Sequence, residues 1–300
     1  MLNTVRKTGC LVNKQSALHS PINLTLHMSL HDDIQYVTSR VASGEFPRYL
    51  YKYRPLYEHT ASMPLLENTA SILAKAQVWH PSPTTFNDPF DCQVALDVRR
   101  SSTIVRSVAK LIEKSREQVP MRRADRRRGF NNLRRQTPFT VARAQVWLRE
   151  TLANIGVCSY GTRGDNLLMW AHYADSHRGV CFKFDVLADP AAYLDMKPVT
   201  YSRDYPVLSG LDEQSVSKAL LVKADIWAYE EEFRVFTRTG PGGKAFAKSG
   251  LVEIIIGAKA AEDPVDALVD LLEADPDYGH VRLQQARLST RSFSLEFGQY

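Results

Sequence analysis

Strand-sized apolar runs alternate irregularly with helical patterns along this chain of 300 residues. Residues 49–53 carry aromatic side chains at alternating positions, which predicts a strand, and other strand-like runs recur as far as 292–297. Between them, stretches such as 65–75 and 264–272 have apolar residues at helical spacing. This irregular alternation indicates an α+β fold with a mixed, mostly antiparallel sheet of short strands and flanking helices.

Two common nucleotide-binding motifs do not occur in the sequence. No Gly-x-Gly-x-x-Gly turn follows a predicted strand, and there is no Gly-x-x-x-x-Gly-Lys-Ser/Thr loop. In both motifs the glycines let the backbone approach a phosphate closely. The sequence therefore gives no support to the dinucleotide-binding turn or to the P-loop.

The region from about 101 to 152 is mostly helical by pattern, with breaks expected near Pro120, Gly129 and Pro138. We expect a helical insertion in a single α+β domain that spans 31–300, rather than a second core.

This insertion holds much of the net charge of +5. Its basic residues are densest from Arg122 to Arg135, and between 106 and 149 only Glu113, Glu117 and Asp125 oppose them. Because a cationic surface can bind phosphates, we predict that nucleic acid or another anionic partner binds there. A solvated helical face is the alternative. Aromatic residues are few in the insertion, so base stacking is not indicated.

Cysteine usage and hydropathy suggest a location. The four cysteines are widely scattered and lack the spacing of zinc ligands, so we expect free thiols, a reducing compartment and no metal site. No apolar run is long enough to span a bilayer, so we expect a cytoplasmic protein without a membrane partner. The cysteines are Cys10, Cys92, Cys158 and Cys181.

The first 30 residues contain basic residues but no acid and no signal-like apolar segment. We expect a disordered or non-native extension there, with Met28 as a possible true start. An organelle-targeting segment is the alternative.

Four motifs follow one another along the chain. They lie at 50–54, at 86–91, at 166–174 with Gly179, and at 227–234 preceded by Lys223. Their order and content resemble the bacterial domain-of-unknown-function 2971 family over about residues 48–300, without the basic stretch at 106–149. The resemblance implies a bacterial, phage-related or defence-like setting, but it indicates no particular reaction.

The last motif places two carboxylates near an arginine. If 229–234 is a strand, Glu230, Glu232 and Arg234 project from one face, and Tyr229 projects from the other. Two carboxylates on one face repel each other unless a cation or a ligand neutralises them. The sequence leaves open whether Arg234 forms a structural ion pair or whether the carboxylates act on a substrate.

Two other motifs offer polar candidates. Trp170 and Tyr173 share a helix face, and His172 between them is a candidate acid or base near neutral pH. The alternative is that both aromatic rings are core and that His172 is a hydrogen-bonded structural residue. Asp88, before a proline, is expected to cap a turn, and a ligand contact by Asp88 or Asp91 is the functional alternative.

The layout of the motifs is similar to that of ADP-ribosyltransferases: a basic and aromatic strand, a strand with a serine, and a late strand opening with Glu-x-Glu. This resemblance implies an enzyme that uses NAD. Glu232 would stabilise an oxocarbenium-like ribose, Glu230 would orient a hydroxyl group, and His172 is the third catalytic candidate. The substrate-binding candidates are Tyr51, Lys52, Arg54, Asn87, Asp88, Asp91, Ser159, Trp170, Tyr173, Trp227, Tyr229 and Arg234.

Two alternatives belong to other classes of protein. In a metal-dependent nuclease, Asp88, Asp91, Glu230 and Glu232 would bind a divalent cation and His172 would act as base. In a non-catalytic sensor or nucleic-acid-binding module, the four motifs would be scaffold and the basic insertion would bind the partner.

Overall fold

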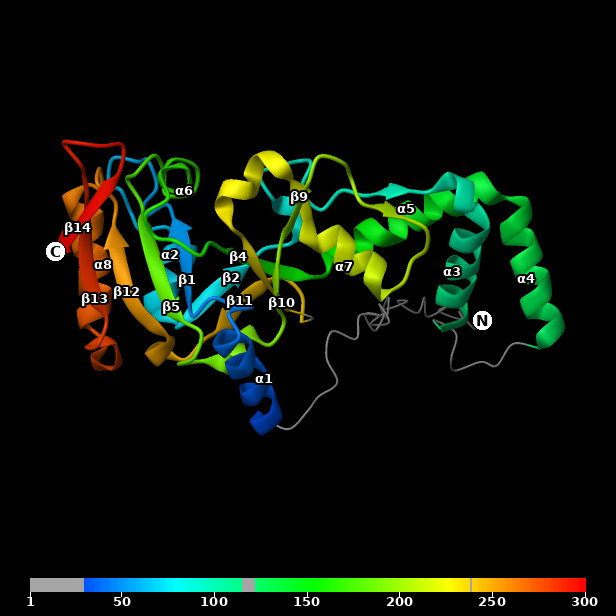
Figure 1. Ribbon diagram of the computed structural model, residues 1–300, viewed down its shortest axis with the longest axis horizontal. Coiled ribbons are helices and arrows are strands. Elements are labelled where there is room, and N and C mark those ends of the chain that lie inside the picture. The colour runs from blue at the N-terminus through cyan, green and yellow to red at the C-terminus, as the bar shows by residue number, and fades with distance from the viewer. Residues whose placement is uncertain (1–29, 115–121, 238) are drawn as a thin grey trace, which may run out of the picture.

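The computed structural model of the protein describes residues 30–114, 122–237 and 239–300. Its largest sheet has five strands in the order β1-β5-β12-β13-β14 (Figure 1). Within this sheet β12 and β13 pair in parallel and the other neighbours are antiparallel. The strands are β1 (Tyr49–Arg54), β5 (Val180–Asp185), β12 (Leu251–Ile256), β13 (Arg282–Leu288) and β14 (Leu295–Gln299). The expected α+β fold with a mixed, mostly antiparallel sheet is confirmed. The extension predicted over the first 30 residues lies outside the described part of the chain, except for its last residue.

A three-stranded antiparallel sheet in the order β4-β10-β6 lies beside the first and carries part of the last motif. Short two-stranded ladders pair β2 with β11, β3 with β8, and β7 with β9. The strands are β2 (Gln77–His80), β3 (Ala95–Leu96), β4 (Gly156–Tyr160), β6 (Met196–Pro198), β7 (Thr200–Ser202), β8 (Val207–Leu208), β9 (Val222–Ala224), β10 (Phe233–Thr237) and β11 (Gly242–Ala245).

Three helices cover one face of the five-stranded sheet. Strand residues such as Leu50, Phe182 and Ile254 are fully buried there against side chains of the helices. Burying a side chain of this size contributes about 1.5–3 kcal/mol, so this cluster is the main source of stability for the sheet. The helices are α1 (Leu30–Ala42), α2 (Glu67–Ala74) and α8 (Glu262–Glu273).

The opposite face of the sheet is covered at one end by α6 (Leu167–Tyr173). The side chain of Asn166 caps this helix by accepting hydrogen bonds from the backbone N–H groups of Leu168 and Met169. Trp170 of α6 is fully buried, packs edge-on against Tyr53 and donates its indole N–H to a backbone carbonyl. The helical motif of the sequence therefore anchors this end of the sheet.

The basic insertion forms an arm of three helices at the far end of the molecule from β14 (Figure 1). They are α3 (Ser101–Lys114), α4 (Arg123–Arg135) and α5 (Thr137–Ala153). A break occurs between α4 and α5 close to Pro138, as expected, but Gly129 does not interrupt α4. A single exposed glycine costs a helix only about 1 kcal/mol, which the good helix formers around it, mostly arginines, can offset.

The arm packs into a second hydrophobic cluster, which it shares with segments outside the insertion. Leu148 of α5 and Ile104 of α3 pack there with residues of α7 (Glu213–Leu221) and with Phe236 of β10. The side chain of Asp212 caps α7 by accepting the backbone N–H of Ser215. The sequence missed this core because its apolar residues come from segments far apart in the chain.

Six short 3-10 helices complete the described structure within residues 30–114, 122–237 and 239–300. They are η1 (Pro83–Thr85), η2 (Val98–Arg100), η3 (Pro190–Tyr193), η4 (Asp225–Glu230), η5 (Lys248–Gly250) and η6 (Pro276–Tyr278).

Candidate functional site

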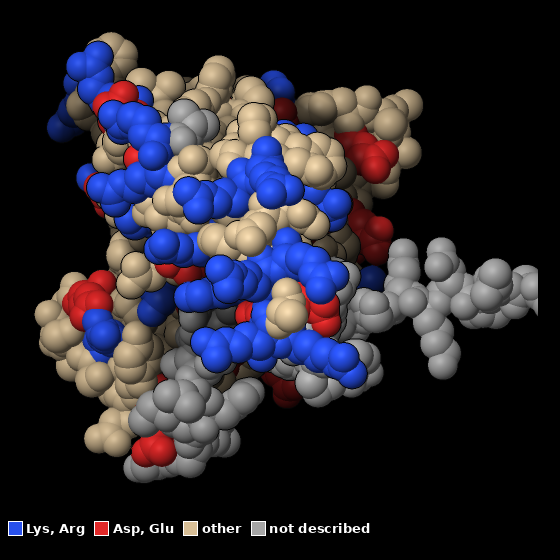
Figure 2. All heavy atoms as spheres, turned by 90° about the vertical axis from the view of Figure 1, so that its right-hand side faces the viewer, with Lys and Arg blue, Asp and Glu red and all other residues tan. Residues whose placement is uncertain are grey.

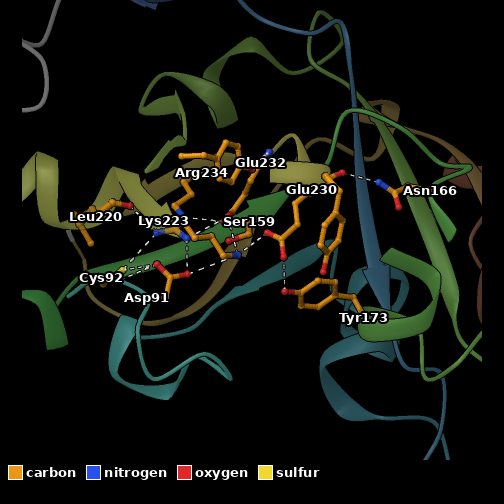
Figure 3. A network of polar contacts seen from close by, with 12 residues as sticks. Asp91, Cys92, Ser159, Asn166, Tyr173, Leu220, Lys223, Glu230, Glu232 and Arg234 are labelled. Carbon is orange, nitrogen blue, oxygen red and sulfur yellow. Dashed lines mark hydrogen bonds and ion pairs between the residues drawn. The ribbon is translucent and has the colours of Figure 1, made fainter. Parts of the chain in front are cut away.

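Three carboxylates and two cations from separate segments meet between the two hydrophobic clusters (Figure 3). Asp91 lies in the loop before β3, Lys223 on β9 and Glu230 at the end of η4. Glu232 lies just before β10, and Arg234 lies on β10. All five side chains are buried. We call this set of five residues the buried ion network.

The expected strand over 229–234 is wrong in its first half. Glu230 ends η4, Glu231 adopts a left-handed conformation with φ 45°, and β10 begins only at Phe233. A tight reversal, and not strand alternation, brings Glu230 and Glu232 to the same side. Sequence periodicity cannot predict a left-handed glutamate, because this conformation costs a non-glycine residue energy that only tertiary contacts can offset.

Arg234 is the centre of the network, and its side chain is 0% exposed. Its Nε donates to Glu232 Oε1 at 2.7 Å, and its Nη2 donates to Asp91 Oδ2 at 2.6 Å. Its Nη1 donates to the backbone carbonyl of Leu220 at 2.6 Å. A planar guanidinium can satisfy several acceptors at once in this way, which an ammonium cannot do with the same geometry.

Lys223 neutralises the remaining carboxylate oxygens. Its Nζ donates to Glu230 Oε2 and, at 3.2 Å, to Glu232 Oε2, and lies 3.8 Å from Asp91 Oδ2. The ammonium also lies 5.2 Å from the centre of the Trp227 ring. Lys223 thus fills the space among the carboxylates that the metal hypothesis assigned to a divalent cation.

The network holds three carboxylates and two cations. The pKa values of its two glutamates are shifted in opposite directions. Burial opposes ionisation of Glu232, but Arg234 and Lys223 outweigh burial and lower its pKa well below the usual range. Burial raises the pKa of Glu230, with Glu232 adding to the effect while Lys223 opposes it. Glu230 is therefore the carboxylate that carries the surplus charge.

Glu230 also bonds to an aromatic side chain of α6. The Tyr173 hydroxyl donates to Glu230 Oε1 at 2.6 Å, and burial followed by Glu230 raises the pKa of Tyr173. A hydrogen bond with the exposed Asn87 opposes that rise. Asn166, the cap of α6, donates to the backbone carbonyl of Tyr229 at 2.6 Å. The second, third and fourth motifs of the sequence therefore meet at Glu230.

Three aromatic side chains form a cluster beside this point. The ring centres of His172, Trp227 and Tyr229 lie 5.9–6.3 Å apart. His172 is exposed and the other two are half-buried. Burial and then Glu230 raise the pKa of Tyr229 to about 12. Trp170, a fourth sequence candidate, faces the core and has no exposed surface for a ligand.

Four further candidates of the sequence analysis, Ser159, Lys52, Arg54 and Asp88, lie outside the network. Ser159 on β4 makes a side-chain hydrogen bond with Glu232, and its carbonyl accepts a bond of 2.8 Å from Lys52 Nζ. Arg54 has a buried Nε without a hydrogen-bond partner among the described residues, and burial lowers its pKa. Asp88 accepts the backbone N–H of Phe90 at 2.8 Å, which is the turn that the sequence predicts.

Tyr51 lies elsewhere, in a shallow hollow of about 370 Å³ between the loop at 161–167 and β13–β14. A second hollow of about 330 Å³ shares Arg163 and Asp165 with the first. No residue of the buried ion network lines either of them. Tyr51 is thus separate from the Glu230 and Glu232 cluster.

Sequence reasoning missed three contributors to the network. Lys223 closely precedes the last motif, and a lysine near two glutamates is a signal that the sequence contains. Cys92 Sγ lies 3.4 Å from Arg234 Nη1, and the Tyr201 hydroxyl accepts the backbone N–H of Glu232 at 2.8 Å. Nothing local in the sequence links these two residues to the last motif.

The arm presents a strongly basic face. Figure 2, which looks at this end of the molecule, shows many Lys and Arg side chains gathered across the middle of this face, with few acidic side chains among them. Among the described residues of the arm, one ion pair is formed, between Arg126 and Glu113 at 3.7 Å. The exposed basic residues are Arg106, Lys110, Arg122, Arg123, Arg126, Arg127, Arg128, Arg134, Arg135, Arg143 and Arg149.

Within residues 30–114, 122–237 and 239–300, no group of three or more His, Cys, Asp or Glu side chains is arranged to hold a metal ion. No described helix is long and apolar enough to cross a membrane. Comparisons of the chain with protein-family models, with curated proteins and with solved structures gave no match.

Proposed function

We propose that this protein binds nucleic acid through the basic face of its helical arm. The observation that supports the proposal is the set of eleven exposed basic side chains on α3–α5, of which one, Arg126, is in an ion pair with a described acid. Closely spaced positive charges repel one another, so an arm of this kind is more stable with a polyanion bound.

The composition of α4 favours nucleic acid over a membrane surface. No residue of α4 is buried, and Leu133 and Phe130 are its only large apolar side chains. A helix that lies on a membrane needs a continuous apolar face, which α4 lacks. Its cations are arginines, whose planar donors bind a phosphate in a bidentate manner.

The side chains of the arm also indicate which part of a nucleic acid they would contact. Phe139 is exposed on α5, but aromatic side chains are otherwise sparse on the arm, so bases have few rings on which to stack. We therefore expect contacts with the phosphate backbone, little dependence on base sequence and a steep loss of affinity with added salt.

A charge-reversal experiment tests the proposal. Arg127 and Arg134 are seven residues apart and share a stripe of α4, so the double variant Arg127→Glu/Arg134→Glu removes adjacent phosphate contacts. A control, Arg203→Glu/Lys259→Glu, changes the net charge equally at exposed positions outside the arm. We expect the arm variant to lower the affinity for a fluorescent DNA or RNA duplex at least about tenfold at low salt and to flatten the salt dependence. Equal binding by both variants, or no binding by the wild type, rejects the proposal.

An NAD-dependent ADP-ribosyltransferase is the second candidate. It is favoured by the hydrogen bond of Ser159 with Glu232, since Ser159 lies on β4 and Glu232 immediately precedes the neighbouring strand β10, similar to the transferase layout. Because Glu232 is enclosed by Arg234 and Lys223, Glu230 beside Tyr173 is the carboxylate better placed to meet a substrate. In this proposal His172 and Trp227 would contact NAD.

Release of nicotinamide from NAD, with protein or nucleic acid added as acceptor, tests this second candidate. Wild-type activity that is lost in Glu230→Gln and retained in the arm variant would support it. No release of nicotinamide by the wild type would reject it. The family resemblance, the cytoplasmic location and the phage-defence setting are proposals under both candidate functions.

A further inference from the structure

The outer edge of the five-stranded sheet is formed by β14, at the opposite end of the molecule from the arm (Figure 1). The other edge strand, β1, is partly covered, because Tyr51 pairs with Gly161 through two backbone hydrogen bonds. On its outer side β14 pairs with no described strand. It contains no lysine or proline, the residues that commonly protect an edge, and its one charged residue is Glu296.

Large apolar side chains are exposed around this edge. Phe293 is 101% exposed, Leu288 56%, Tyr300 50% and Phe297 38%. Single exposed apolar residues are common, but a group of this size within one hairpin is typical of a protein–protein contact.

The hydrogen bonds between β13 and β14 determine which backbone groups point outward. The Ser289 N–H donates to the Ser294 carbonyl at 3.1 Å, and the Tyr300 N–H donates to Leu283 at 3.3 Å. In an antiparallel pair the direction of the N–H and C=O groups alternates along each strand. The even-numbered residues from 294 to 300 therefore face β13. The N–H and C=O groups of Leu295, Phe297 and Gln299 face outward.

We propose that the partner of this edge is a second copy of the same chain. The two β14 strands pair antiparallel about a twofold axis, with Phe297 opposite its counterpart in the second copy. This register uses every outward backbone group of β14, because Leu295 then stands opposite Gln299. It also places Glu296 opposite Gly298, where no side chain repels it.

The neighbouring registers are less favourable. Pairing centred on Glu296 would bring two carboxylates directly opposite each other, and like charges in that position are destabilising. Pairing centred on Gly298 would place Phe297 opposite Gln299 and so lose the aromatic pair. The register centred on Phe297 also creates an aromatic cross-strand pair, which contributes about 0.5–1.5 kcal/mol beyond area burial.

Cysteine cross-linking tests the register. Opposite residues in a hydrogen-bonded pair have Cα atoms about 5.5 Å apart, within the range that a disulfide spans. In a Cys10→Ser background, where the three remaining cysteines are buried, Phe297→Cys should form a dimer with oxidised glutathione. A mixture of Leu295→Cys and Gln299→Cys should cross-link between the two variants. Faster cross-linking of Glu296→Cys than of Phe297→Cys would overturn the register.

Sedimentation of the unmodified chain tests the pairing itself. We expect a concentration-dependent dimer, which Phe297→Lys converts to monomer while the circular dichroism spectrum is unchanged. Leu288→Lys is the control, because it introduces the same charge at an exposed apolar residue of β13, an inner strand whose backbone pairs with β14 and not with the second copy. A wild-type monomer at about 100 µM, or equal loss of dimer in both variants, would overturn pairing along β14. The result does not depend on nucleic-acid binding, because the arm lies at the other end of the molecule.

Discussion

Replacing Glu232 or Glu230 by glutamine makes the same chemical change two residues apart, yet we expect very different effects on stability. In Glu232→Gln, Arg234 keeps Asp91 and the Leu220 carbonyl but loses its charged bonds of 2.7 and 3.2 Å to Glu232. A buried cation that loses a partner in this way costs about 3–5 kcal/mol.

Glu230→Gln removes the surplus negative charge instead. Lys223 retains Glu232 at 3.2 Å, and the Tyr173 hydroxyl can donate to the amide oxygen of the glutamine. Repulsion between the two carboxylates and the cost of burying Glu230 disappear, which offsets much of the lost hydrogen bond. We expect a net loss of no more than about 1 kcal/mol at neutral pH.

The two variants should also differ in their pH dependence. The pKa of Glu230 is raised in the folded protein, so its protonated form contributes stability that is present below the unfolded pKa of about 4.3 and is lost as pH rises through the folded pKa. The cost of Glu230→Gln therefore shrinks as pH rises. The pKa of Glu232 is lowered, so its contribution is present above about pH 4.3 and is lost as pH falls further. The cost of Glu232→Gln therefore shrinks in acid.

Urea unfolding followed by circular dichroism and tryptophan fluorescence, from about pH 3 to pH 8, measures both effects. We expect the difference in unfolding free energy between the variants to be about 2–4 kcal/mol at neutral pH and to narrow toward the acid end. Variants that agree within about 1 kcal/mol, or a difference that does not change with pH, would refute this assignment of the surplus charge to Glu230.

Three further substitutions test the packing. Gly179→Ala would place a Cβ atom 2.1 Å from the backbone oxygen of Arg54, so we expect a loss of more than about 2 kcal/mol in urea unfolding. Gly129→Ala, with no atom within 4 Å of the new Cβ, should stabilise α4 by about 0.5–1 kcal/mol, and a loss there would contradict the helical assignment. Tyr173→Phe removes the hydroxyl donor to Glu230 and should cost about 1.5–3 kcal/mol, and no change would mean that the bond is not made in solution.

Local pattern was enough to predict most elements of the fold. Alternating aromatic residues predicted β1, and the strands at β4, β5 and β12 and the helices α2 and α8 follow from their periodicity. The ladder of β2 with β11 is harder to predict, because the run Gly-Pro-Gly-Gly at 240–243 is typical of a turn, yet Gly242 and Gly243 belong to β11. Such a strand is specified by its partner and not by its own side chains.

The site was harder to predict from the sequence than the fold. Glu230, Glu232 and Arg234 lie close together, as the sequence predicts. The cause is the left-handed backbone at Glu231 and not the strand alternation that the sequence suggests. The separation of Tyr51 from this cluster and the complete burial of Trp170 depend on tertiary packing. A motif indicates that its residues are important for structure or function, but it does not show whether a residue contacts a ligand or packs in the core.

The position of the buried ion network between two hydrophobic clusters gives it a structural role. Val235 of β10 packs in the cluster of the sheet, whereas Phe236 packs in the cluster of the arm. Arg234, on the same strand, bonds to Asp91 and to the carbonyl of Leu220, whose side chain lies in the arm cluster. Buried ion pairs add little net stability but can select one arrangement of the segments that they join. The network therefore ties the loop before β3 and the end of α7 to β10, at the point where that strand passes from one cluster to the other.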